Sequence, residues 1–265
     1  MIRRAGNRGS FYPADCEDVK KMIDNFNRVL EKSDLIDELS KISPKALIVP
    51  HAGYIYSGFT ANVAYRAIKR SKVDRVVVIG PSHHVYFKGI SVATNDYYET
   101  PCGNLLIDKP YIKRLRDRFE FVSMPNLHYL EHSTETQMPF IRHYLPESHI
   151  LEILYGDVDY KELSNLINFL IKDGGNLVVI SSDLSHFLSV DEAKKLDNIC
   201  LAGVGQKSIA LLEKGCQACG LLGIKGVVEV AKARNLRVKL LDYRTSADIS
   251  GDETRVVGYM SALFF

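Results

Sequence analysis

Histidines stand directly behind two short apolar segments of this chain. His51 follows segment 45–50, and His83 and His84 come shortly after segment 74–80. Imidazole has an unperturbed pKa of ~6.5, so near neutral pH it can bind a metal or exchange a proton. Imidazoles gathered in one place fit either a transition-metal site or a metal-free acid–base site. We expect His84 to contribute least, because adjacent residues rarely both point into one site.

A third apolar segment, 176–181, is followed by Asp183 and His186. If the three segments are parallel strands, the polar residues behind them meet at one carboxyl edge of the sheet. Asp183 and His186 are therefore candidate catalytic groups, acting as a proton relay or orienting a ligand. Asp183 could instead have a purely structural role, since aspartate is a common helix N-cap.

Two further polar clusters could join this edge. Glu131 and His132 precede a helical pattern, where a glutamate would also stabilise the helix dipole without any chemistry. Cys219 precedes another helical pattern, and a thiol at a helix N-terminus favours the thiolate, which suits metal binding. A small buried thiol is the alternative for Cys219. Cys216 and Cys219 make only half of a zinc motif, which argues against a structural zinc site.

These residues need a sheet to position them, and the apolar pattern predicts one. Short apolar segments alternate with helical periodicity, which indicates βαβ units and a parallel sheet. We predict a three-layer α/β domain with a mixed, largely parallel central sheet. The expected strands are 45–50, 74–80, 149–155, 176–183, 236–243 and 254–265, the last as an edge strand, with antiparallel strands inserted within 89–108. The expected helices are 57–71, starting at Ser57, 160–175, a region near 190–212 and one near 220–235.

The composition is that of an ordinary globular protein. The 265 residues are 46% hydrophobic and 25% charged, with a net charge of +2, and we expect one domain over residues 1–265. That charge argues against nucleic acid as a partner, and no apolar run is long enough to span a membrane. Without a secretory signal, the five cysteines predict reduced thiols and a cytoplasmic location. Nucleotide-binding glycine motifs are absent.

Eight motifs, taken together and in order, resemble the Memo family (mediator of cell motility) over nearly the whole chain. They are AGNRGSFYPAD, PHAGYIYSGFTAN, GPSHH, TPCGNL, EHSTETQMPFI, SSDLSHF, CG and GYMS. This resemblance implies a fold like that of the class III extradiol dioxygenases, which hold iron(II) between two histidines and a carboxylate. By the same resemblance, His51 and His83 match the histidine ligands, Cys219 takes the third place, and Asp183 and His186 line the pocket.

The implied cofactor is iron(II) or copper, and the purified protein could carry neither. A thiolate in place of a carboxylate favours copper(I) or redox-active iron. The first hypothesis is therefore a metal-binding redox protein and, if an enzyme, a metal-dependent oxidoreductase. The second is a module that binds an anionic peptide or small acid without turnover, and the third is metal-free hydrolysis or lyase chemistry. The ligand, the native metal and self-association stay open at this point.

Overall fold

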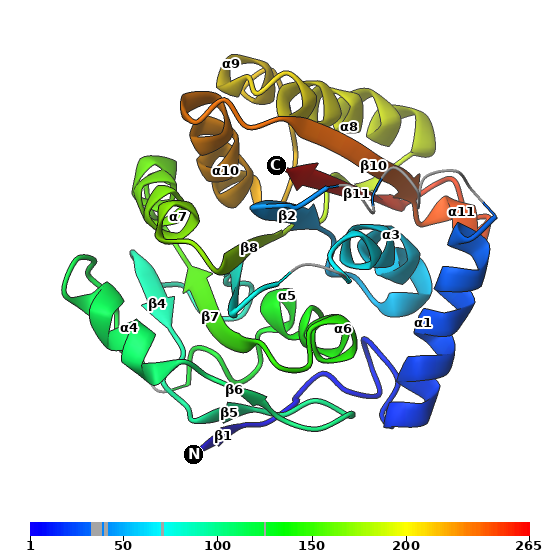
Figure 1. Cartoon of the computed structure of the whole chain (residues 1–265). Coiled ribbons are helices and arrows are strands. Elements are labelled where there is room, and N and C mark those ends of the chain that lie inside the picture. Colours follow the sequence, from blue (N-terminus) through cyan, green and yellow to red (C-terminus); the bar gives the residue numbers. More distant parts are fainter. Residues whose placement is uncertain (33–38, 40–41, 70–71, 125) are drawn as a thin grey trace.

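A central sheet with helices on both faces forms the computed structural model of the chain (Figure 1). The structure describes residues 1–32, 39, 42–69, 72–124 and 126–265. The last two residues of the helix predicted over 57–71 lie outside this part. The architecture confirms the predicted three-layer α/β class.

The main sheet is mixed and largely parallel, as predicted. Four neighbouring strands run parallel, β3 pairs with both β7 and β8, and antiparallel strands flank them on both sides. Within the described residues the strand order is β10 (Val238–Thr245), β11 (Val256–Phe264), β2 (Ala46–Val49), β8 (Asn176–Ser181), β3 (Arg75–Pro81), β7 (His149–Tyr155) and β4 (Ile90–Val92), and β9 (His186–Leu188) pairs with β11 off this path.

The central strands are buried on both faces, which explains their continuous apolar sequences. All four residues of β2 are fully buried, and so are all six residues of β8 except for a small exposed part of Asn176. The prediction that the last strand is an edge was wrong. β11 lies between β10 and β2, and all of its residues except the half-buried Val257 are buried, whereas β10 is half-exposed and forms the edge.

Helices cover both faces of this sheet (Figure 1). One face carries α1 (Cys16–Leu30), α3 (Tyr54–Ala67), α5 (His132–Glu135) and α6 (Met138–Tyr144). The other carries α7 (Tyr160–Asp173), α8 (Val190–Gly205), α9 (Ile209–Leu212) and α10 (Leu221–Ala233), and α4 (Lys109–Arg116) and α11 (Ala247–Ser250) lie at the periphery. Helix α3 starts at Tyr54 rather than Ser57, because Gly53 is its N-cap.

The inserted segment forms antiparallel pairs, as predicted. β4 runs antiparallel to β7, and β5 (Tyr97–Tyr98) runs antiparallel to β6 (Leu105–Leu106). The sequence did not predict that β1 (Ile2–Arg3) pairs with β5 to complete a small second sheet.

Four of the five cysteines form disulfides, so the prediction of reduced thiols was wrong for them. Cys16 pairs with Cys102, and Cys200 pairs with Cys216, at Cα–Cα distances of 4.7 and 4.8 Å. These distances lie in the range that a disulfide needs, and only the fold brings the pairs this close. Cys219 is a free thiol.

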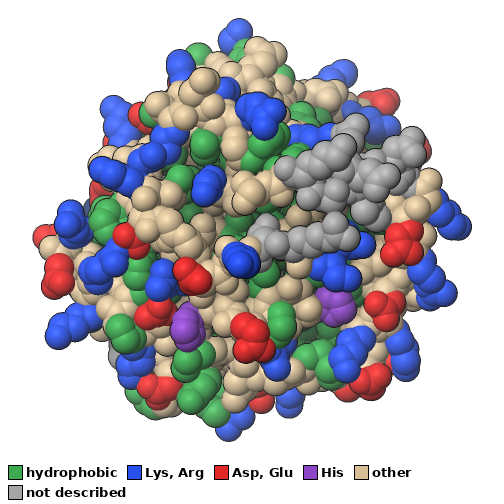
Figure 2. Space-filling view, viewed as in Figure 1, with side chains coloured by type: hydrophobic (Ala, Val, Ile, Leu, Met, Phe, Trp, Pro, Cys, Tyr) green, Lys and Arg blue, Asp and Glu red, His purple; other side chains and the backbone are tan. Residues whose placement is uncertain are grey.

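Acidic and basic side chains are interspersed on the face shown in Figure 2, consistent with the small net charge. In the described part of the chain, no helix is both long and apolar enough to cross a bilayer.

Candidate metal centre

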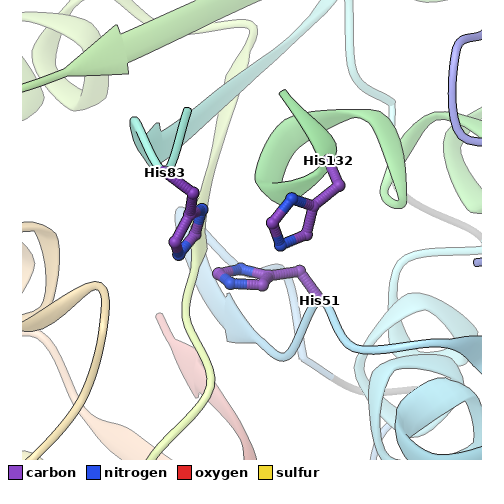
Figure 3. Close-up of side chains that lie close together, drawn as sticks. All are labelled: His51, His83 and His132. Atoms are coloured by element: carbon purple, nitrogen blue, oxygen red, sulfur yellow. The ribbon is translucent and has the colours of Figure 1, made fainter. Parts of the chain in front are cut away.

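Three imidazoles from separate parts of the chain meet at the carboxyl edge of the sheet (Figure 3). His51 lies two residues after β2, His83 two residues after β3, and His132 is the first residue of α5. One ring nitrogen from each lies within 4.8 Å of the other two. The ring centroids are 4.6 to 5.5 Å apart. The predicted clustering at strand ends is therefore present, with His132 as a full member.

A glycine allows the short helix with His132 to approach the strand before His83. A Cβ added at Gly80 would lie 2.6 Å from Ser133 Oγ, so any larger residue would push α5 away from β3. The Ser133 hydroxyl donates to the carbonyl of Pro81, the last residue of β3, at 2.8 Å. Close packing between β3 and α5 thus brings His83 and His132 together.

The tautomer of His51 is set by hydrogen bonds behind its ring. Its Nδ1 lies 3.0 Å from Ser181 Oγ. The Ser181 hydroxyl donates to the carbonyl of Ser133, and the Gln137 amide donates to Ser181 Oγ at 2.9 Å. Because the single hydroxyl proton of Ser181 is used, its oxygen must accept from Nδ1–H of His51. Nε2 of His51 then carries the lone pair, which faces the Cys219 thiol at 3.3 Å and can instead bind a ligand.

A buried carboxylate orients His83 in the same way. Glu131 accepts from His83 Nδ1 at 2.9 Å and from the His83 backbone N–H at 2.6 Å, and it also accepts from the Ser133 backbone N–H. Burial disfavours its charge, but these hydrogen bonds outweigh burial and lower the pKa of Glu131 to about 2. A carboxylate that fixes the remote nitrogen of a histidine is the usual support for a metal-bound imidazole.

Burial keeps two of the three imidazoles neutral. Burial and the neighbouring His83 lower the pKa of His51 to about 3. Burial and the neighbouring His51 lower the pKa of His132 to about 4. His84 is exposed, and its Nε2 lies 3.4 Å from His132 Nδ1, at the outer side of the cluster. Neutral imidazole is the form that binds metals, so His51 and His132 can bind a cation near pH 7.

Cys219 lies beside the cluster, with Sγ 3.3 Å from His51 Nε2. It precedes α10 as predicted, but the expectation of a favoured thiolate was wrong for the protein without a metal. Burial and the nearby Asp183 carboxylate raise the pKa of the thiol to about 12. A bound cation would reverse this, because a coordinating thiol loses its proton. Gly220 permits the close approach, since a Cβ there would lie 2.5 Å from Ser182 Cβ.

Asp183 holds two loops of the site together. Its carboxylate accepts from the backbone N–H groups of His51, at 2.7 Å, and Ala52, at 3.3 Å. Its own backbone exchanges hydrogen bonds with Cys219, donating to Sγ at 3.3 Å and accepting from the Cys219 N–H at 3.2 Å. Burial raises its pKa. The geometry therefore gives Asp183 a positioning role.

His186 lies in β9, half-buried, close enough to influence both His51 and Asp183 electrostatically.

The sequence did not predict three other residues that support the imidazoles of the site: Ser181, Gln137 and Phe11, whose ring stacks on His132. Ser181 and Gln137 lie inside motifs that also hold site residues, and that adjacency was the only signal for them.

The donor set suits a first-row transition metal. Neutral imidazoles bind zinc, copper, iron and nickel, and a nearby thiol adds preference for softer ions such as copper(I). Two of the imidazoles have their remote nitrogens fixed by hydrogen bonds, which leaves the facing nitrogens to bind. The residues present therefore fit a metal.

The fold and this cluster define an α/β protein with a histidine centre at the carboxyl edge of a mixed sheet. A family model described as Memo-like protein matches residues 3–263, and the chain belongs to this family. A MEMO1 family protein of Aquifex aeolicus is 33% identical, with 99% of both chains covered, and one of Methanobrevibacter smithii is 30% identical, with 100% of both chains covered.

A likeness to a solved structure supports the fold alone. The crystal structure of the uncharacterized protein JW3007 from Escherichia coli K12 superposes with a TM-score of 0.52 at 12% identity. The match covers 82% of this chain and 98% of that one.

Proposed function

We propose that this protein binds iron or copper through His51, His83 and His132, with Cys219 as a fourth donor, and uses the metal for redox chemistry. The observation that carries the proposal is the convergence of three imidazole nitrogens within 4.8 Å of one another. Hydrogen bonds to Ser181 and Glu131 already direct the metal-binding nitrogens of His51 and His83. A site organised in this way loses little conformational freedom when the metal binds.

Bound iron or copper would supply one-electron chemistry that amino-acid side chains lack. The chain itself would orient the ligands: Glu131 holds His83, and Asp183 holds the backbone at His51. His186, half-buried beside the Asp183 carboxylate, is the proposed group for proton exchange with a bound ligand. The protein would then be a metal-dependent oxidoreductase. We propose a cytoplasmic location for it, although its two disulfides are of a kind that is rare in that compartment.

Anaerobic titration of the untagged protein with iron(II), copper(I) and zinc(II) tests the proposal. We expect one metal per chain for the wild type and a loss of at least about 100-fold in affinity for His83→Ala/His132→Ala. His143→Ala is the control, since His143 is a half-buried histidine on α6 outside the cluster. Equal affinity of wild type and double variant for all three metals would end the proposal.

Two other functions have less support from the site. A binding module for an anionic peptide or small acid would gain from positively charged histidines. However, burial lowers the pKa of His51 and His132 far below neutrality. Metal-free hydrolysis or lyase chemistry would need Asp183 to face a substrate, whereas its Oδ1 already accepts from the backbone N–H groups of His51 and Ala52.

A further inference from the structure

The N-terminal segment 3–12, called here the N-terminal strap, is fastened to the helix that carries His132. Its anchor is Glu135, the last residue of α5, whose side chain is fully buried. This carboxylate accepts five hydrogen bonds, all from the strap: from Arg3 Nη1, Gly6 N at 3.1 Å, Asn7 N at 2.6 Å, Asn7 Nδ2 at 3.1 Å and Tyr12 OH at 2.8 Å.

Such an anchor is strong because a buried carboxylate needs partners. An ionised group taken out of water costs several kcal/mol unless charged and polar donors surround it. Arg3 is also buried, at 1% exposed, and its Nη2 donates to the carbonyl of Glu131 at 3.0 Å. The strap therefore contacts both ends of α5, directly before and three residues after His132.

The end of the strap contacts the metal-binding imidazole itself. The ring of Phe11 stacks on His132, with centroids 4.6 Å apart and planes at 28°. His83 stacks on His132 with the same separation and angle. Two rings cannot occupy one face of an imidazole, so Phe11 and His83 lie on opposite faces of His132.

Phe11 also connects this helix to the loop with His51. Its carbonyl accepts from the backbone N–H of Tyr54, the first residue of α3, at 2.7 Å. His51 lies three residues before Tyr54. One residue of the strap thus contacts the His132 ring and the start of the helix that follows His51.

We propose that the N-terminal strap positions His132 for the metal, with Glu135 as its anchor and Phe11 as the wall that holds the imidazole against His83. This inference rests on the proposed metal-binding function. Without Phe11, one face of His132 is unsupported, and the ring can turn away from the other two donors. Phe11 and Glu135 are positioning residues, because neither supplies a donor atom to the metal.

The test compares Phe11→Ala, Phe11→Leu and the conservative Phe11→Tyr, with Phe169→Ala as a matched control. Phe169 is likewise half-buried, but it lies on α7 against Phe119, away from the cluster. Cobalt(II) spectra report ligand geometry, and competition with a chromogenic chelator gives zinc affinity. We expect Phe11→Ala to weaken zinc about 10- to 100-fold and to alter the cobalt spectrum. Phe11→Leu should restore little, Phe11→Tyr should restore both readouts, and Phe169→Ala should change neither.

A second measurement keeps the strap testable without any metal. In histidine-labelled protein free of metal, the His132 ring resonances should move in Phe11→Ala and return in Phe11→Tyr. If wild type binds no metal, the proposed function fails, but this readout still tests the strap. A folded Phe11→Ala protein with wild-type zinc affinity, cobalt spectrum and His132 resonances would overturn the inference, and so would an equal effect of Phe169→Ala.

Discussion

Replacing Ser181 by alanine removes the group that sets the tautomer of His51. The Ser181 hydroxyl joins three buried partners: His51 Nδ1, the Gln137 side-chain amide and the Ser133 carbonyl. The Gln137 amide keeps its hydrogen bond to the carbonyl of Pro50, at 2.9 Å, so losing its bond to Ser181 costs little stability. The other two groups lose this partner while buried, at about 1–3 kcal/mol each. We expect Ser181→Ala to lower the free energy of unfolding by about 2–6 kcal/mol.

The same change should weaken metal binding, because His51 can then place its proton on the nitrogen that faces the metal. Loss of a histidine's hydrogen-bond support typically costs about 10- to 100-fold in metal affinity. Urea unfolding and zinc competition measure the two effects separately. Ser261→Ala is the control: Ser261 is a fully buried serine of the same sheet whose hydroxyl has no hydrogen-bond partner among the described residues. Wild-type zinc affinity in folded Ser181→Ala would refute the tautomer argument.

Three further results are expected. Cys219→Ser should weaken copper(I) at least about tenfold more than zinc(II), because the thiol is the soft donor, and equal losses in the two titrations would contradict its role. Replacing both cysteines of a disulfide by alanine should lower the free energy of unfolding in urea. We expect a loss of about 3 kcal/mol for Cys200/Cys216, which close a 16-residue loop, and about 4.5 kcal/mol for Cys16/Cys102, which close an 86-residue loop. Equal losses for the two pairs would count against loop-closure entropy as the cause. Burial disfavours the charge of Asp108, but bonds from the Tyr111 N–H and from Arg75 outweigh it and lower its pKa. The stabilisation that the ionised Asp108 side chain contributes is present above its unfolded pKa of ~3.9 and is lost as pH falls through its lower folded pKa. Asp108→Asn should therefore cost about 1–2 kcal/mol at pH 7 and less at pH 3 in urea unfolding, and a pH-independent cost would exclude this charge effect.

The sequence alone determined the main parallel strands and the edge of the sheet at which the polar site residues lie. Short continuous apolar segments that alternate with helical patterns indicate buried strands, and the helical crossovers make these strands parallel, so their carboxyl ends share one edge. His51, His83 and Asp183 each stand two residues beyond such a strand, and each lies at the site. Local pattern and chain connectivity suffice for this conclusion.

Only the tertiary structure decided how the groups at that edge divide their tasks. Whether His132 joins His51 depends on α5 packing against β3, and the His51 tautomer depends on Ser181 and Gln137, which are 44 residues apart in sequence. The disulfide partners and the stacking of Phe11 on His132 are likewise contacts between distant segments. Residue types and spacing reveal which groups can react, but the roles follow from distances of a few ångströms that the folded chain alone sets.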